Sequence, residues 1–144
     1  MASESSASEH SLRPGQVFAR RVREARKGRG WTQAELAERV RERTGYPISR
    51  VTITKIERGE GRAENTPLQE ILVLAAALDV APVHLLAPLE NEAAVKLGDK
   101  LTVPATYARA WVRGLIPLPG GDLRWFMLQM PDAELRSLLR QVLL

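Results

Sequence analysis

The sequence predicts an all-α fold in which five helices over residues 14–87 are followed by a small, mainly helical extension over residues 88–144. Two observations predict this fold. Apolar residues recur three and four positions apart along most of the chain, which is the spacing of one face of an α-helix. Helix-start signals and helix-ending glycines lie only a few residues apart, so the helices are joined by short loops.

The first two predicted helices are marked at both ends. The first begins at Pro14, whose missing N–H is not needed in a first helical turn, and ends at Gly28. The second opens with Thr32 and Glu35, which form a T-x-x-E capping box, and closes at Gly45. Their expected buried residues are Phe18, Val22, Ala25, Leu36, Ala37 and Val40.

The next three predicted helices complete the domain. Ser49 is expected to cap a short third helix, which Gly59 follows. Thr66 is expected to cap the fourth, with a proline at its first position, and Pro82 begins the short fifth. Because the fourth helix is apolar nearly all round, we expect it to be central and buried. The expected buried residues are Ile53, Ile56, Ile71, Leu72, Leu74, Ala75 and Leu78, and the fifth helix carries Val83, Leu85 and Leu86.

The extension contains three further predicted helices. Residues 88–103 form either a small hairpin or a linker. One helix begins at Pro104 and stops before Gly114, a short one follows the loop 116–121, and the last begins at Pro131. Apolar side chains are abundant for so short a region: Trp111, Trp125, Phe126, Leu135, Leu138, Leu139 and Val142. We expect them to form a dimerisation surface, although the pattern is equally consistent with packing of a small subdomain.

The composition is that of an ordinary globular protein. Residues 1–13 are Ser-rich and are expected to form a disordered tail. The absence of cysteine excludes disulfides, thiol nucleophiles and thiolate metal sites. No apolar run reaches the roughly 18 residues of a membrane span, and the N-terminus lacks the pattern of a secretory signal. We therefore expect a cytoplasmic protein that does not associate with a membrane.

Positive charge is concentrated in one segment of the chain. Residues 13–62 carry 14 Lys/Arg and 6 Asp/Glu, a net charge of +8, whereas residues 63–144 carry 7 and 9. Such an asymmetry is typical of a protein that binds a phosphate backbone. An arginine-rich, solvated helical surface is the alternative explanation for the charge alone.

Two motifs lie in the second and third predicted helices. The first is Q-A-E-L-A over residues 33–37, and the second is S-R-V-T-I-T-K-I-E-R-G over residues 49–59. With these motifs and the apolar spacing around them, residues 15–87 resemble the helix-turn-helix domain of the lambda/434 repressor and Cro family, also called the XRE family. The resemblance implies a five-helix, repressor-like DNA-binding domain whose third helix enters the major groove.

The third helix has the chemistry that such a role requires. A helix in the major groove needs apolar residues behind it and short polar or basic residues in front. Arg50 has the geometry to bind a guanine edge, and Gln33 resembles the family glutamine that binds a backbone phosphate. The residues expected to contact double-stranded DNA are Gln33, Ser49, Arg50, Val51, Thr52, Thr54, Lys55 and Arg62. The alternative for each is an ordinary solvent-facing residue.

The resemblance also implies a structural ion pair. Arg26 stands where the family has an arginine that pairs with the glutamate matching Glu57. Trp31 stands at an aliphatic family position and is expected in the core. Residues 39–47 are longer than the usual turn, which leaves the angle between the second and third helices open. The arginines in this stretch either touch the DNA backbone or, more simply, form a solvated face: Arg39, Arg41 and Arg43.

Other functions find less support. We expect no enzyme, cofactor or metal, because His10 and His84 lack a partner at ligand spacing and no phosphate-binding or nucleophile motif occurs. RNA binding requires exposed stacking aromatics on the basic surface, where few aromatics occur. The main alternative is an antitoxin or partner-binding adaptor with the same fold. We expect a sequence-specific transcriptional regulator, a repressor that binds a palindromic operator as a homodimer, with a protein partner or small effector at the extension as a further option.

Overall fold

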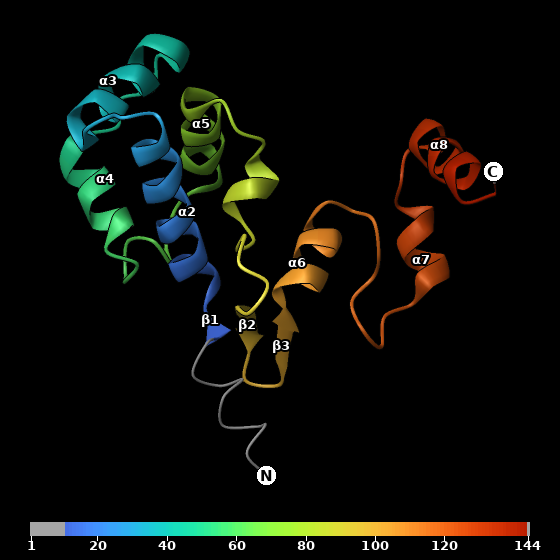
Figure 1. The fold of residues 1–144 in the computed structure, drawn as a ribbon. Coiled ribbons are helices and arrows are strands. Elements are labelled where there is room, and N and C mark those ends of the chain that lie inside the picture. The colour runs from blue at the N-terminus through green and yellow to red at the C-terminus, as the bar shows by residue number, and fades with distance from the viewer. Residues whose placement is uncertain (1–10, 144) are drawn as a thin grey trace.

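The protein is mostly helical and also contains a small sheet (Figure 1). A computed structural model describes residues 11–143. Over these residues the chain forms seven α-helices, one 3-10 helix and a three-stranded sheet. The prediction of an all-α fold therefore needs correction. No helix within residues 11–143 combines the length and the apolar character needed to cross a membrane.

All five helices predicted for the N-terminal part are present. They are α2 (Pro14–Gly28), α3 (Gln33–Thr44), α4 (Arg50–Glu57), α5 (Leu68–Leu78) and the 3-10 helix η1 (Pro82–Leu85). Their inner faces form one hydrophobic core, because apolar residues three and four apart meet at the centre. We call this the main core: Phe18, Val22, Leu36, Val40, Ile48, Ile53, Ile56, Val73, Leu74, Ala75, Ala77, Leu78 and Leu85.

Two of the predicted helix caps are present and a third is not. The hydroxyls of Thr32 and Ser49 each accept a hydrogen bond from a backbone N–H of the first turn, at 3.1 Å. Thr66 does not cap α5, because its hydroxyl donates backwards to the carbonyls of Arg62 and Ala63 at 3.0 and 2.9 Å. Pro67 occupies the capping position instead, without a side-chain hydrogen bond.

The extra length between the two motifs extends α3. This helix continues to Thr44 and ends at Gly45, whose φ of 76° lies in the left-handed region that glycine adopts without strain. Three residues, 46–48, then lead to Ser49 at the start of α4. The inserted residues therefore lengthen a helix rather than form a long flexible turn.

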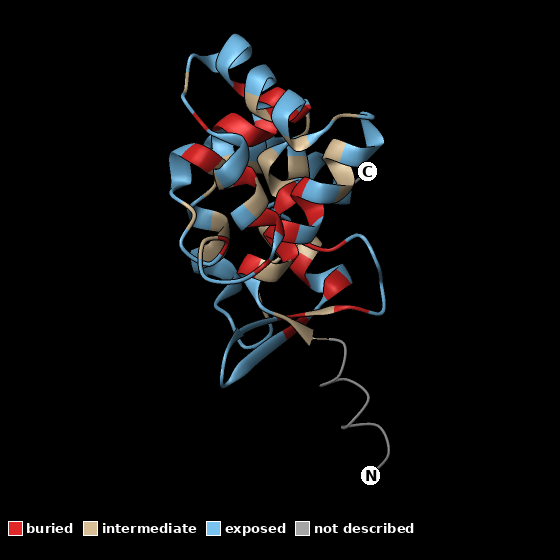
Figure 2. Ribbon diagram, turned by 90° about the vertical axis from the view of Figure 1, so that its left-hand side faces the viewer, coloured by how far each residue is buried: buried red, intermediate tan, exposed pale blue. Residues whose placement is uncertain are grey.

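The helix α5 is buried on one side only. Its inner side contacts α2, α3 and η1 and contributes to the main core. Leu68 and Leu72 lie on the other side and are 71% and 47% exposed. The expectation of a fully central helix with Leu72 inside was wrong, because this side of α5 is exposed. Figure 2 shows that helices of the protein carry both buried and exposed residues.

The sheet joins the start of the chain to the extension. Strands β2 (Ala94–Gly98) and β3 (Leu101–Pro104) form an antiparallel hairpin, and β1 (Ser11–Leu12) pairs with β2 in parallel. Residues 88–103 therefore contain the hairpin rather than a linker alone. The expectation of a disordered tail over residues 1–13 was wrong for Ser11 and Leu12, and its remaining part up to residue 10 lies outside the described residues.

The hairpin packs against the first helix of the main body. A second small apolar cluster contains Val17, Ala87, Val95, Val103 and Ala108. Val95 and Val103 are paired across the two strands, so their side chains lie on the same face of the hairpin. This cluster fixes the helix α6 (Ala105–Val112), which supplies Ala108, next to the N-terminal half of α2.

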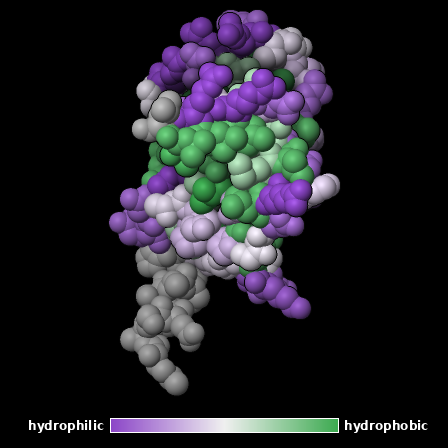
Figure 3. Space-filling view, turned by 90° about the vertical axis from the view of Figure 1, so that its right-hand side faces the viewer, coloured by the Kyte–Doolittle hydropathy of each residue, from purple (hydrophilic) through white to green (hydrophobic). Residues whose placement is uncertain are grey.

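The last two helices contribute little to either core. They are α7 (Leu123–Leu128) and α8 (Asp132–Leu143), and Figure 1 shows them standing apart from the other helices. No described residue of α7 or α8 is buried. Figure 3 shows a broad apolar surface on this side of the molecule. The most exposed large apolar residues of α7 and α8 are Leu123, Trp125, Leu128, Val142 and Leu143.

Candidate nucleic-acid interface

The helix α4 lies at the surface with one side in the main core. Ile53 and Ile56 are fully buried behind it. On the outer side Arg50 and Lys55 are exposed, and Val51 is 52% exposed. Among residues 11–143 the side chains of Arg50 and Lys55 have no hydrogen bond or ion pair, so both cations are available to an external ligand. This arrangement is the apolar-behind, polar-in-front pattern of a helix that binds in a groove.

The short polar residues of α4 are partly used within the helix. The Ser49 hydroxyl accepts from the Thr52 amide and lies 3.0 Å from the Thr52 hydroxyl. Thr54 is half-buried, and its hydroxyl lies 3.0 Å from the Arg50 carbonyl and 2.6 Å from the Gln33 side-chain oxygen. The outermost surface of α4 therefore consists of Arg50, Val51 and Lys55, and the hydroxyl groups lie at its edges.

Gln33 joins the start of α3 to α4. It accepts from Thr54 through Oε1, and its Nε2 donates to Oε2 of Glu57 at 3.3 Å. These two bonds fix the orientation of the side-chain amide. Because the first backbone N–H groups of a helix have no partner within the helix, this end of α3 presents donors for an anion beside α4.

Glu57 is the buried carboxylate at the centre of this region. Its side chain is 1% exposed. Arg26 donates to Oε1 from Nη2 at 2.7 Å and to Oε2 from Nε at 3.0 Å. Arg26 also donates to the Trp31 carbonyl at 2.7 Å, and Arg23 donates to the Glu57 carbonyl at 3.0 Å. The structure thus places the expected partners Arg26 and Glu57 in contact, and the pair attaches α2 to the end of α4.

Arg62 has a different environment from the other expected contact residues. It lies in the loop between α4 and α5, and its side chain is only 28% exposed. Its guanidinium donates to the buried carboxylate of Glu70 and, at 3.4 Å, to the Asn65 carbonyl. The structure does not place Arg62 with Arg50 and Lys55 as an unpaired surface cation.

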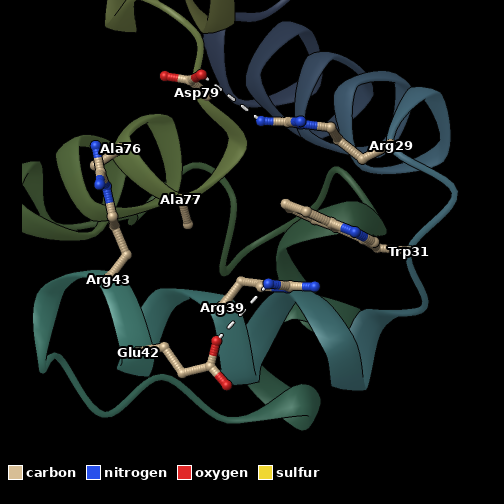
Figure 4. A pocket seen from close by; sticks show the side chains of 8 residues that line it. All are labelled: Arg29, Trp31, Arg39, Glu42, Arg43, Ala76, Ala77 and Asp79. Atoms are coloured by element: carbon tan, nitrogen blue, oxygen red, sulfur yellow. Dashed lines mark ion pairs between the residues drawn. The ribbon is translucent and has the colours of Figure 1, made fainter.

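The arginines of the lengthened α3 line a separate cleft (Figure 4). Trp31 is half-buried against the main core, and the guanidinium groups of Arg29 and Arg39 lie 5.1 and 5.2 Å from its ring centroid. Arg43 and the end of α5 complete this cleft of about 560 Å³. Arg41 forms an ion pair with Glu38 instead. Because the cleft lies between α3 and α5, Arg39 and Arg43 do not extend the outer surface of α4.

Glu70 and Tyr46 were not among the residues that the sequence predicted for this region. Glu70 is buried, and its Oε1 lies 3.4 Å from the hydroxyl of Tyr46. A usable signal was present, because Glu70 is the one charged residue in α5, which is otherwise apolar except for Gln69. A buried carboxylate in such a helix requires a partner, and that requirement points to a nearby cation.

Comparison with known proteins covers the N-terminal half of the chain. A family model described as a helix-turn-helix domain matches residues 17–89. The match includes nearly all of α2, the whole of α3, α4, α5 and η1, and every residue expected to contact a ligand. No curated protein and no solved structure matches the chain.

Proposed function

The chain belongs to the helix-turn-helix domain family, which indicates DNA binding in transcription regulation, and we propose that it is a sequence-specific regulator that inserts α4 into the major groove. One observation carries this proposal. The outer side of α4 presents two cations, Arg50 and Lys55, that have no partner within residues 11–143, beside the exposed Val51. The inner side is fixed in the main core by Ile53 and Ile56.

We propose distinct roles for the three outermost residues of α4. Arg50 follows the cap residue Ser49, at the end of the helix that would enter the groove, and binds a guanine through two hydrogen bonds. Val51 packs against a thymine methyl group. Lys55 lies one turn further along and binds a base edge or a phosphate. Thr52 and Thr54 contribute at the edges, and Gln33 with the start of α3 binds a phosphate that fixes the register.

The finer family assignment is also a proposal. The ion pair of Arg26 and Glu57, and Gln33 at the first position of α3, fit the lambda/434 repressor and Cro group that the sequence resembles. We propose that the protein acts as a repressor that occludes a promoter. In this proposal residues 14–87 form the DNA-binding domain and residues 88–144 form the dimerisation region.

The apolar surface of α7 and α8 supports self-association. An exposed apolar surface of this kind is typical of a protein interface. A two-fold dimer would present two copies of α4 to the half-sites of a palindrome, about one helical turn apart. The expected interface residues are half-buried (Trp111, Phe126, Leu135 and Leu138) or exposed (Leu139, Trp125 and Val142).

The position of this surface places a condition on the dimer. It lies on the side of the molecule away from α4 (Figures 1 and 3). Two copies joined through it reach one duplex only if α7 and α8 turn relative to the rest of the chain. Residues 113–122 connect α6 to α7 and contain two prolines and three glycines, so we propose this segment as the site of the turn. Without the turn, a dimer would bridge two separate duplexes.

Selection of binding sites from random duplexes tests the proposed function. The wild-type protein should enrich a palindromic sequence, and Arg50→Ala should lose roughly 1–3 kcal/mol of discrimination at one base pair of each half-site. Arg41→Ala is the matched control, because it removes an exposed arginine of α3 that is already paired with Glu38. The proposal fails if the wild-type protein enriches no sequence, or if both variants change base preference equally.

A further inference from the structure

Both ends of α4 are connected to a single buried carboxylate. Glu70 lies on α5 and is 6% exposed. Tyr46 donates its hydroxyl hydrogen to Oε1 of Glu70 at 3.4 Å, and Arg62 donates from Nη2 to Oε2. Tyr46 belongs to the segment that leads into α4, and Arg62 belongs to the loop that leaves it. Glu70 thus joins the segment before α4 to the loop after it.

The two donors are themselves held by their surroundings. Tyr46 packs against the main core, and its backbone N–H donates to the Thr44 hydroxyl at 3.1 Å. The Arg62 carbonyl accepts from Thr66 at 3.0 Å, which ties the loop to the start of α5. Both residues that bind Glu70 are therefore also held by contacts to other parts of the protein, unlike side chains that pair at an exposed surface.

Apolar packing alone leaves the orientation of α4 poorly defined. The helix is short, and Ile53 and Ile56 are the two residues that hold its inner side in the main core. Apolar contacts are non-directional, so they resist separation more than they resist a small rotation or tilt. Base recognition needs side chains held close to their productive geometry by directional contacts behind them. The bonds of Tyr46 and Arg62 to Glu70, and of Arg26 to Glu57, provide such contacts.

We propose that Glu70 is a positioning residue that sets the orientation of α4 through Tyr46 and Arg62, and that Arg62 acts on Glu70 rather than on a DNA phosphate. This inference rests on the proposed function of α4. A DNA phosphate would compete with the Glu70 carboxylate for the charge of Arg62, whose side chain is only 28% exposed. If the guanidinium moved to the phosphate, the buried carboxylate would keep only its long bond to Tyr46. Loss of a cation from a buried carboxylate is strongly unfavourable, so the contact to Glu70 prevails.

The dependence of DNA binding on salt concentration distinguishes a contact of Arg62 with Glu70 from a contact of Arg62 with a DNA phosphate. We expect Glu70→Gln and Arg62→Gln each to weaken binding to the selected operator roughly tenfold, and the double variant to be no weaker than either single variant. Binding to a random duplex and the dependence of affinity on salt should not change. Glu38→Gln, which removes an exposed carboxylate paired with Arg41, is the control and should leave operator binding unchanged. The proposal is overturned if Arg62→Gln lowers the salt slope by about one and Glu70→Gln has no effect.

Hydrogen exchange tests the positioning role without DNA. In Glu70→Gln and in the gentler Tyr46→Phe, which removes only the hydroxyl, amides of α4 should exchange faster than in the wild-type protein. Amides of α2 should change less, so a general loss of stability is recognisable. Unchanged exchange in α4 would refute the positioning role even if the protein binds DNA. If the wild-type protein binds no DNA, the proposed function fails, and the exchange result still decides the role of Glu70.

Discussion

The helices α4 and α8 have similar sequence patterns and different positions in the fold. In α4 the isoleucines lie three positions apart, in α8 leucines and a valine recur three and four positions apart, and polar residues lie between them in both helices. In α4 the apolar residues Ile53 and Ile56 are fully buried, whereas in α8 Val142 is 74% exposed. The pattern predicts an apolar face in both helices, but a buried face also needs neighbouring elements. The fold supplies them around α4 and does not supply them around α8.

This difference divides the chain into a part whose apolar residues are buried in a core and a part whose apolar surface is exposed. The helix-turn-helix region (residues 17–89) contains the main core and two buried, paired carboxylates, Glu57 and Glu70. The helices α7 and α8 contain no described buried residue. Stability should therefore reside in the first part, and association in the second.

The largest expected loss of stability follows removal of Glu57. Glu57→Ala leaves the guanidinium of Arg26 unpaired in a mostly buried site, and should lower the free energy of unfolding by about 3–5 kcal/mol in urea titrations. The matched change in α8, Glu134→Ala, removes an exposed carboxylate and should stay within about 0.5 kcal/mol. A double-mutant cycle of Arg26 and Glu57 without coupling would contradict the assigned pairing.

Leucine truncations provide the next comparison. Leu74→Ala creates a cavity in the main core and should cost about 2–5 kcal/mol of unfolding free energy. Leu139→Ala makes the same chemical change in α8, where the side chain is already 39% exposed, and should cost less than about 1 kcal/mol in dilute protein. Equal losses in thermal unfolding would show that α8 is packed as tightly as α5.

Helix caps give a smaller effect. Ser49→Ala removes the acceptor of the Thr52 amide and should cost about 1 kcal/mol. Asp122 caps α7 in the same way, by accepting from the Trp125 amide at 3.0 Å. Because α7 contributes little to the cores, Asp122→Ala should leave the main unfolding transition unchanged. A parallel shift in both variants would mean that α7 unfolds together with the helix-turn-helix region.

The smallest effect on folding is expected for Val142→Asp. The side chain is largely exposed, so the free energy of unfolding should change by no more than about 0.5 kcal/mol. A charge on the proposed interface should nevertheless abolish self-association in analytical ultracentrifugation. A dimer that survives the substitution would exclude this part of α8 from the interface.

Local signals made much of the fold predictable. Thr32 and Ser49 start helices through hydrogen bonds to residues three positions away, so their effect is contained in a short stretch of sequence. Thr66 carries the same kind of signal and fails, because carbonyls of the preceding turn compete for its hydroxyl. The exposure of Leu72 also depends on which elements pack nearby, which periodicity does not specify.

The candidate site was predictable to a similar extent. Arg50, Val51 and Lys55 follow from the helix, its cap and its buried isoleucines. The resemblance to a family supplied the partners Arg26 and Glu57. The bonds of Arg62 and Tyr46 to Glu70 join three segments that are brought together only by the packing of α3, α4 and α5, and no local pattern specifies such a contact.

The parallel pairing of β1 with β2 has a consequence for the order of assembly. Ser11 and Leu12 are made before the helix-turn-helix region, but their partners Ala94 and Val95 leave the ribosome only after the whole of that region. The helices of that region make contacts between nearby residues and form quickly, whereas strand pairing across a long separation is slow. We therefore expect β1 to be the last of these elements to find its place during synthesis, after the DNA-binding helices have already folded.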